Sequence, residues 1–127
     1  MINKKGPFVP SKRSIEGKYA IAYTSWNAEI VNTMLVNAVK ALEAEGVNPK
    51  NIIKIKVPGV FELPSVSNRL ASKDIDAIIT LGCVIRGETP HFDFISNSCA
   101  KGLTKVSIGK EIPVIFGVLT TNNIQQA

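Results

Sequence analysis

The sequence is poor in the side chains that bind metal ions or form disulfides. It contains one histidine, His91, and two cysteines, Cys83 and Cys99, which show no CxxC spacing. A single histidine without clustered cysteines cannot supply the usual ligand set of a zinc site. Both cysteines lie in or next to apolar segments, so we expect buried free thiols, no disulfide and no bound metal.

The sequence also has no long hydrophobic run. Its longest apolar stretch is well short of the ~20 residues that span a bilayer. The first residues, MINKKGPFVPSKRS, lack the apolar core of a signal peptide. We therefore expect a cytoplasmic protein that makes no membrane contact.

Positive charge is concentrated near the N-terminus. The net charge is +5, but residues 1–18 hold five cations against one acid, and the rest of the chain is nearly balanced. No basic stripe interleaved with aromatic residues follows, so nucleic-acid binding is not expected. Residues 1–14 carry two prolines and no hydrophobic periodicity. That pattern is typical of an arm whose conformation is set from outside its own domain.

Beyond the arm, apolar runs typical of strands alternate with helical patterns. With 127 residues, the chain is expected to form one domain over residues 1–127. Strands are predicted in KYAIAYTS (18–25), NIIKIKV (51–57), DAIITLGCVI (76–85) and PVIFGVLT (113–120). Helices are predicted from Asn27 to Gly46, within FELPSVSNRLASK (61–73), from residues 91–93 to Gly109, and from Asn122 or Asn123 within TTNNIQQA (120–127).

This alternation indicates an α/β fold, a three-layer α/β/α sandwich around a four-stranded parallel sheet with flavodoxin-like winding. Ligands of such sheets bind outside the carboxyl ends of the strands, where strand order reverses. The last predicted helix has under two turns and is truncated, so a further segment is expected to complete the domain. The predicted strand ends are TSWN (24–27), PGVFE (58–62), GCVIRGETPH (82–91) and GVLTT (117–121).

The stretch RGETPHFDF (86–94) follows the most apolar predicted strand and contains the only histidine. Its backbone N–H groups, the Thr89 hydroxyl and the start of the next helix are suited to holding an anion, with Arg86 close by. The alternative is ordinary loop chemistry, in which Gly87 turns the chain, Pro90 starts the helix and Thr89 caps it. The pattern GxxxxGK[ST] is absent, so this is not a P-loop.

His91 is the candidate proton carrier of this loop. Histidine is the only side-chain type that ordinarily exchanges its proton near neutral pH, although a lone histidine is more often structural. Glu88 and Asp93 lie near enough in sequence to tune it, and the sequence does not say which carboxylate faces the ring.

Two aromatic residues also follow predicted strands at their carboxyl ends. Trp26 and Phe61 would be exposed there unless a ligand or a subunit covers them, and a flat heterocycle stacked between such rings explains both. Packing inside the domain is the alternative. Glu62 is suited to accepting hydrogen bonds from ligand N–H or O–H groups, or instead to capping the next helix.

Three long motifs, taken together, resemble one known family. VPGVFELP (57–64), GCVIRGETPHFDF (82–94) and PVIFGVLTT (113–121) match the motifs of 6,7-dimethyl-8-ribityllumazine synthase in order and spacing, and the likeness extends from about residue 16 onward. This resemblance implies the condensation of 5-amino-6-(D-ribitylamino)uracil with 3,4-dihydroxy-2-butanone 4-phosphate, releasing phosphate and water, in riboflavin biosynthesis. It also implies that neither a metal nor an organic cofactor takes part.

The resemblance assigns His91 as the general acid/base, and Glu88 and Thr89, mainly through backbone N–H groups, as ligands of the butanone phosphate. Trp26 matches the aromatic residue that stacks on the pyrimidine, where many members have phenylalanine. Phe116 matches a residue that closes the pyrimidine site from an adjacent subunit. The other substrate contacts implied are Val60, Phe61, Glu62, Cys83, Val84 and Ile85.

Family members assemble as pentamers or as icosahedral shells of pentamers (60-mers), and the N-terminal segment adds a strand to a neighbour's sheet. The resemblance therefore implies a homo-oligomer, this use for residues 1–14, and riboflavin synthase as a further partner. The family's C-terminal helix carries an arginine for the substrate phosphate, and nothing in residues 1–127 matches it, so weak phosphate binding is expected of this chain alone.

Two other functions stay open at this point. A relative that binds flavin or lumazine, or forms shells, without turnover would keep the same motifs. A signalling domain of the same winding would carry acidic clusters at its strand ends, and only isolated acids occur there in this sequence.

Overall fold

The computed structural model of the protein describes residues 15–72 and 74–127. The arm expected at residues 1–14 lies outside the described residues. The predicted alternation of strands and helices is confirmed. The elements are β1 (Tyr19–Thr24), α2 (Ala28–Ala44), β2 (Ile52–Val57), α3 (Leu63–Leu70), β3 (Ala77–Ile85), α4 (His91–Lys110) and β4 (Val114–Thr121), with the short 3₁₀ turns η1 (Pro49–Asn51), η2 (Val60–Glu62) and η3 (Ile124–Gln126).

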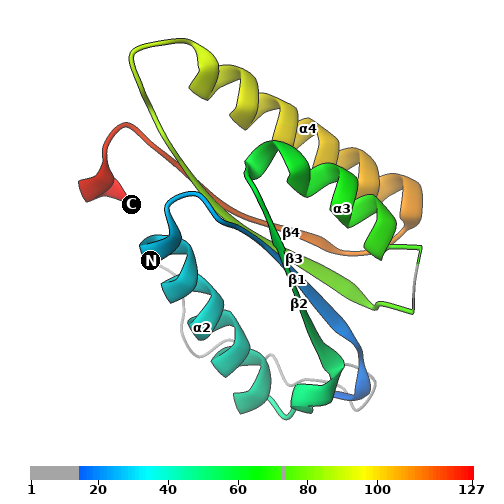
Figure 1. Ribbon diagram of the computed structural model, residues 1–127. Coiled ribbons are helices and arrows are strands. Elements are labelled where there is room, and N and C mark those ends of the chain that lie inside the picture. The colour runs from blue at the N-terminus through cyan, green and yellow to red at the C-terminus, as the bar shows by residue number, and fades with distance from the viewer. Residues whose placement is uncertain (1–14, 73) are drawn as a thin grey trace, which may run out of the picture.

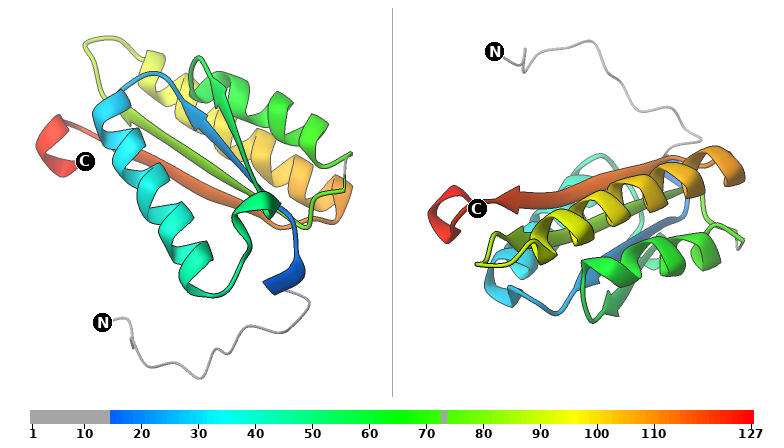
Figure 2. Two further views of the ribbon diagram at one scale, coloured as in Figure 1. Left: turned by 60° about the horizontal axis from the view of Figure 1, so that its bottom comes forward. Right: turned by 90° about the horizontal axis from the view of Figure 1, so that it is seen from above.

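The four strands form one parallel sheet in the order β2-β1-β3-β4. Helix α2 covers one face, and α3 and α4 cover the other (Figure 1). The left view of Figure 2 shows the same layering, with α2 in front of the sheet and the other two helices behind it. The predicted three-layer, flavodoxin-like arrangement is therefore confirmed.

Strand β3 lies in the middle of the hydrophobic core, as its continuous apolar run predicted. Its residues contribute to both core layers, because alternate side chains point to opposite faces of the sheet. The core layer beneath α3 and α4 contains Ala20, Ala22, Val57, Val60, Leu63, Leu70, Ile78, Cys99, Leu103, Ile112 and Val118. The core layer beneath α2 contains Ile21, Val31, Val47, Ile52, Leu81 and Cys83.

The pairing of β3 leaves one of its edges open near the carboxyl end. Its pairing with β1 stops at Tyr23 opposite Leu81, whereas its pairing with β4 continues to Ile85 opposite Thr121. The segment from Gly82 to Ile85 therefore has a strand neighbour on one side only. Beyond the end of β1, the other side is the wall of a hollow, and this offset in register positions the site described below.

Helices α3 and α4 approach each other closely at Gly102. A Cβ atom at this position would lie 2.7 Å from both Cβ and Cγ of Pro64, closer than packed atoms tolerate. The absence of a side chain at Gly102 therefore allows α4 to lie against the start of α3.

Two helix predictions were wrong, the end of α4 and the type of the last helix, whereas the alternative cap at Asn123 is confirmed. Helix α4 does not end at Gly109 but continues to Lys110, and Glu111 adopts the left-handed conformation at φ 52°. The fourth helix is not an α-helix from Asn122. Strand β4 continues to Thr121, and η3 follows, with the Asn123 side chain accepting a hydrogen bond from the Gln126 N–H at 3.0 Å.

Within residues 15–72 and 74–127, no helix combines the length and apolarity required to cross a membrane.

Gly109→Ala is expected to stabilise the protein by about 0.5–1 kcal/mol, because glycine inside a helix costs about that much relative to alanine. A Cβ atom at Gly109 would meet no atom within 4 Å. Thermal unfolding measures the effect. Gly102→Ala is the matched control on the same helix and should lower the melting temperature, because its Cβ would collide with Pro64. Equal shifts for the two variants would contradict this account.

Candidate functional site

A hollow of about 630 Å³ opens at the carboxyl edge of the sheet, where β1 and β3 lie side by side and lead into helices on opposite faces. This is the point of strand-order reversal at which α/β sheets bind ligands. The residues that line it are Trp26, Asn27, Pro58, Gly59, Val60, Phe61, Glu62, Cys83, Val84, Ile85, His91 and Ile95.

The turn after β1 presents Trp26 to this cavity. The Trp26 N–H donates to the Pro58 carbonyl at 3.4 Å, and the Thr24 hydroxyl donates to the Trp26 carbonyl at 3.3 Å. These bonds hold the backbone, while the indole ring is 74% exposed. An exposed ring at the rim of an apolar hollow provides a stacking surface for a planar ligand.

Asn27 is a cavity residue that the sequence reasoning did not assign to the site. It occupies the N-cap position of α2, as predicted, but its side chain makes no capping bond. Its backbone is left-handed, with φ 56°, and its Nδ2 donates to the Cys83 carbonyl at 2.8 Å. Asn27 therefore bridges the ends of β1 and β3. The only signal in the sequence was the tolerance of asparagine for the left-handed region.

The turn η2 contributes Phe61 and Glu62. The Glu62 carboxylate accepts a hydrogen bond from the Gly59 N–H at 2.9 Å through Oε2, and the Glu62 N–H donates to the Gly59 carbonyl at 3.2 Å. Glu62 occupies the N-cap position of α3 but makes no side-chain capping bond there; its carboxylate instead closes the η2 turn, and it also lines the cavity. Phe61 is 61% exposed, so the prediction of an uncovered ring is confirmed for the described residues.

The segment Cys83–Ile85 forms the wall along β3. Burial raises the pKa of the Cys83 thiol above its ordinary value, so this thiol stays protonated at neutral pH. Cys83 therefore contributes an apolar side chain to the cavity wall and is not an activated nucleophile. The other thiol, Cys99, lies in the core, where burial raises its pKa to about 11. Both cysteines are free, as predicted.

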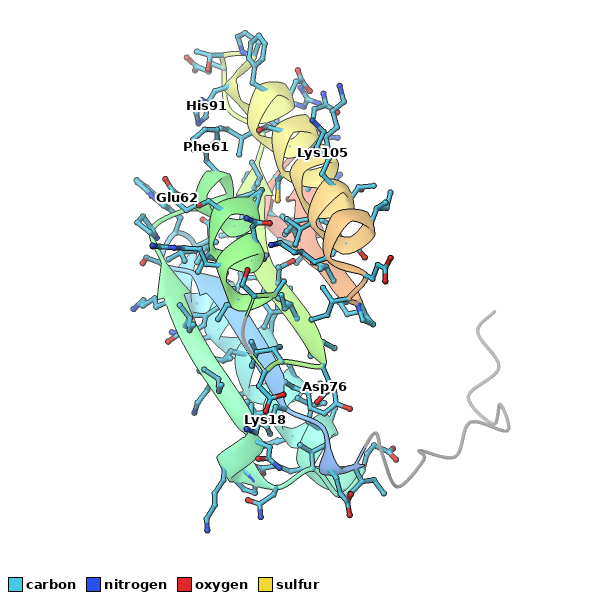
Figure 3. The ribbon with its side chains drawn as sticks, turned by 90° about the vertical axis from the view of Figure 1, so that its right-hand side faces the viewer. Lys18, Phe61, Glu62, Asp76, His91 and Lys105 are labelled. Atoms are coloured by element: carbon cyan, nitrogen blue, oxygen red, sulfur yellow. The ribbon has the colours of Figure 1, made fainter. Side chains whose placement is uncertain are left out.

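His91 is the first residue of α4 and lies at the mouth of the cavity. Figure 3 shows it at the same end of the molecule as Phe61 and Glu62, far from Lys18 and Asp76. Its N–H donates to the Thr89 hydroxyl at 3.5 Å, a long bond, and the N-cap position of α4 belongs to Pro90, not to Thr89. Asp93 is not the carboxylate that interacts with the His91 imidazole, because it forms an ion pair with Arg86 at 3.3 Å.

The sequence model of the 6,7-dimethyl-8-ribityllumazine synthase family matches residues 16–127 of this chain. The chain belongs to this family. A protein from Parabacteroides distasonis named 6,7-dimethyl-8-ribityllumazine synthase is 44% identical over 113 residues, which cover 88% of this chain and 71% of that protein.

Most of the residues that the family resemblance singled out lie together around the one cavity. The structure places Trp26, Val60, Phe61, Glu62, Cys83, Val84, Ile85 and His91 on its walls. Asn27, Pro58, Gly59 and Ile95 also line it and were not singled out, although the first three lie within the predicted strand ends TSWN and PGVFE.

Three predicted site residues of this family member lie off the cavity wall. Glu88 and Thr89 are exposed on the loop before α4 and are not among the lining residues. Phe116, 46% exposed on β4, faces a separate hollow of about 340 Å³ between α4 and β4. Within the part of the chain that the structure describes, no three His, Cys, Asp or Glu side chains are grouped as metal ligands would be.

Proposed function

We propose that this chain forms 6,7-dimethyl-8-ribityllumazine by condensing 5-amino-6-(D-ribitylamino)uracil with 3,4-dihydroxy-2-butanone 4-phosphate in the cavity at the carboxyl edge of the sheet. The observation that carries the proposal is the convergence of Trp26, Phe61, Glu62 and His91, from three separate segments of the chain, on one hollow in a chain of this family. The volume of about 630 Å³ is in the range of small-molecule sites.

The pyrimidine binds in the apolar half of the cavity. The Trp26 indole stacks on the ring, and Phe61 and Val60 cover it from the β2 side. Glu62 accepts hydrogen bonds from ligand N–H or O–H groups, because the capping bond to the Gly59 N–H occupies only Oε2. Along β3, Cys83, Val84 and Ile85 line the third wall.

The butanone phosphate lies at the other end of the cavity, next to the start of α4. A helix of this length presents unpaired N–H groups and a partial positive charge at its first turn. Glu88 and Thr89 contribute through backbone N–H groups, and Thr89 also through its hydroxyl. Their places just outside the cavity wall agree with contact to a charged group at the rim, where water remains close.

The chemistry requires proton transfer and orientation more than strong electrophilic activation. The amine of the pyrimidine attacks the ketone and water leaves to form an imine. Phosphate is then eliminated, and the resulting enol becomes a ketone. The ribitylamino nitrogen attacks this carbonyl carbon, and a second water leaves as the ring closes to the lumazine. His91, at the mouth of the cavity and the start of α4, moves protons during these steps. The walls hold both substrates in one relative orientation, which contributes at least as much to the rate.

Phe116 supports a role for a second copy of the chain. Its ring is partly exposed and lies outside the cavity of its own subunit, between α4 and β4. We infer a homo-oligomer, a pentamer or an icosahedral 60-mer, in which Phe116 closes the pyrimidine site of a neighbour. We further propose that residues 1–127 form one domain and that the protein is cytoplasmic. Its product is then taken up by riboflavin synthase as a partner.

Mixing the two substrates with the protein tests this function. We expect the lumazine absorbance to appear together with one equivalent of inorganic phosphate, at a rate proportional to protein concentration. A reaction without protein gives the background rate. Binding of flavin or lumazine without product formation would instead identify the non-catalytic relative, for which the comparisons offer no support.

A further inference from the structure

Arg86 connects three segments at the edge of the candidate site without lining the cavity. Its Nε donates to the Asn122 side-chain oxygen at 3.0 Å, and its two terminal nitrogens donate to the two oxygens of Asp93 at 3.3 and 3.4 Å. Its guanidinium carbon lies 4.4 Å from the centre of the Phe92 ring. The backbone N–H of Arg86 donates to the Thr121 carbonyl at 2.8 Å.

These contacts close the loop that separates β3 from α4. Arg86 precedes residues 87–90, and Phe92 and Asp93 lie in the first turn of the helix that follows them. The bonds from Arg86 to Asp93 therefore tie the two ends of the loop together, and the bond to Asn122 anchors this pair to the end of β4. Residues 87–90 are exposed and do not pack on the core. A tie across the ends of such a loop removes much of its conformational freedom.

We propose that Arg86 is a positioning residue. Its contacts with Asp93, Phe92 and Asn122, here called the clamp, hold the 87–90 loop and the adjacent His91 in the geometry that receives the phosphate-bearing substrate. This inference rests on the proposed function of the site. It assigns Arg86 no direct contact with phosphate, because Asp93 neutralises the guanidinium and the donors described above point to Asp93 and Asn122. It also explains why Asp93 is not a partner of the His91 ring.

The experiment compares Arg86→Gln, Asp93→Asn and the double variant with the unchanged protein. We expect each single variant to raise the KM of the butanone phosphate by about three- to fivefold, the upper part of the effect that a half-exposed ion pair supplies. The KM of the ribitylaminouracil should change less than about twofold, because its half of the cavity does not contain the clamp. The double variant should be no worse than either single one, because each change already breaks the same link.

Lys105→Gln is the matched control. Lys105 is an exposed cation on α4, away from the loop, and its replacement removes the same unit of charge (Figure 3). We expect this variant to leave both KM values unchanged, which separates the clamp from a general attraction between the protein and an anion.

Asp93→Asn distinguishes the clamp from direct binding. If Arg86 itself held the phosphate, releasing it from Asp93 would lower the KM of the butanone phosphate, and that result would overturn the proposal. Additive effects in the double variant would overturn it as well.

Amide hydrogen exchange provides a readout that does not depend on turnover. In both single variants, exchange should accelerate at residues 87–92 and stay unchanged within β3. Unchanged exchange at the loop would refute the clamp whether or not the protein forms lumazine. Absence of product from the unchanged protein would refute the proposed function alone, since the exchange result would still decide the role of Arg86.

Discussion

Replacing His91 with alanine is expected to lower kcat for lumazine formation by about 10²- to 10⁴-fold, the usual contribution of a positioned general acid/base. The reaction should continue at this reduced rate, because the cavity walls still hold the two substrates together. The KM of the ribitylaminouracil should stay within about twofold, since the aromatic half of the cavity is intact. Steady-state kinetics from lumazine absorbance, with each substrate varied in turn, measure these constants.

Two further variants make the His91 result specific. His91→Gln keeps a polar side chain of similar size and should be nearly as slow as His91→Ala, because glutamine does not transfer protons near neutral pH. Asn97→Ala, at an exposed position of the same helix, should keep full activity. Turnover by His91→Ala equal to that of the unchanged protein would remove the imidazole from the mechanism.

Gly82→Val is expected to lower the free energy of unfolding by about 3 kcal/mol, the upper part of the range for overpacking a well-filled interior. Gly82 is buried in β3, and a Cβ there would lie 2.8 Å from the Val60 Cγ2 and 3.3 Å from the Thr24 Cγ2. Both neighbours are β-branched and have little rotamer freedom to move away. Because Val60 begins η2, the collision should also push Phe61 and Glu62 into the cavity and weaken pyrimidine binding.

Denaturant unfolding and the KM of the ribitylaminouracil measure the two effects of Gly82→Val. Gly87→Ala is the control, because a Cβ at Gly87 would meet no atom within 4 Å and its φ is not positive. It should leave the unfolding free energy within about 0.5 kcal/mol, as expected for an exposed site. A stable Gly82→Val protein with an unchanged KM would show that the contact between β3 and η2 does not shape the cavity.

Local sequence patterns predicted the fold well because each element carries its own signal. The apolar run DAIITLGCVI identified the central strand, and β3 covers Ala77–Ile85 of it. The helical spacing after Asn27 and after Pro90 placed α2 and α4 correctly. Since parallel strands bring their carboxyl ends to one edge, the walls of the cavity followed from the same patterns.

Features that depend on packing between distant segments were not predictable in this way. Gly109 is a common helix-ending residue, yet α4 continues past it and Glu111 makes the left-handed turn, one residue beyond Lys110. The bond from Asn27 to Cys83 and the pairing of Asp93 with Arg86 depend on how the segments lie together. For the same reason the sequence placed Glu88 and Thr89 beside His91 without showing that they stay outside the cavity wall.

The close approach of Gly102 to Pro64 has a mechanical consequence for the cavity. Because the two helices are closely packed at this point, a shift of α3 would also displace α4, and these helices begin next to Phe61 and at His91, respectively. We therefore expect the spacing between Phe61 and His91 to change little when a ligand binds. Of the two exposed aromatic rings on the wall, the Trp26 indole is the more exposed, at 74%, so we expect its side chain to move most when a flat ligand enters.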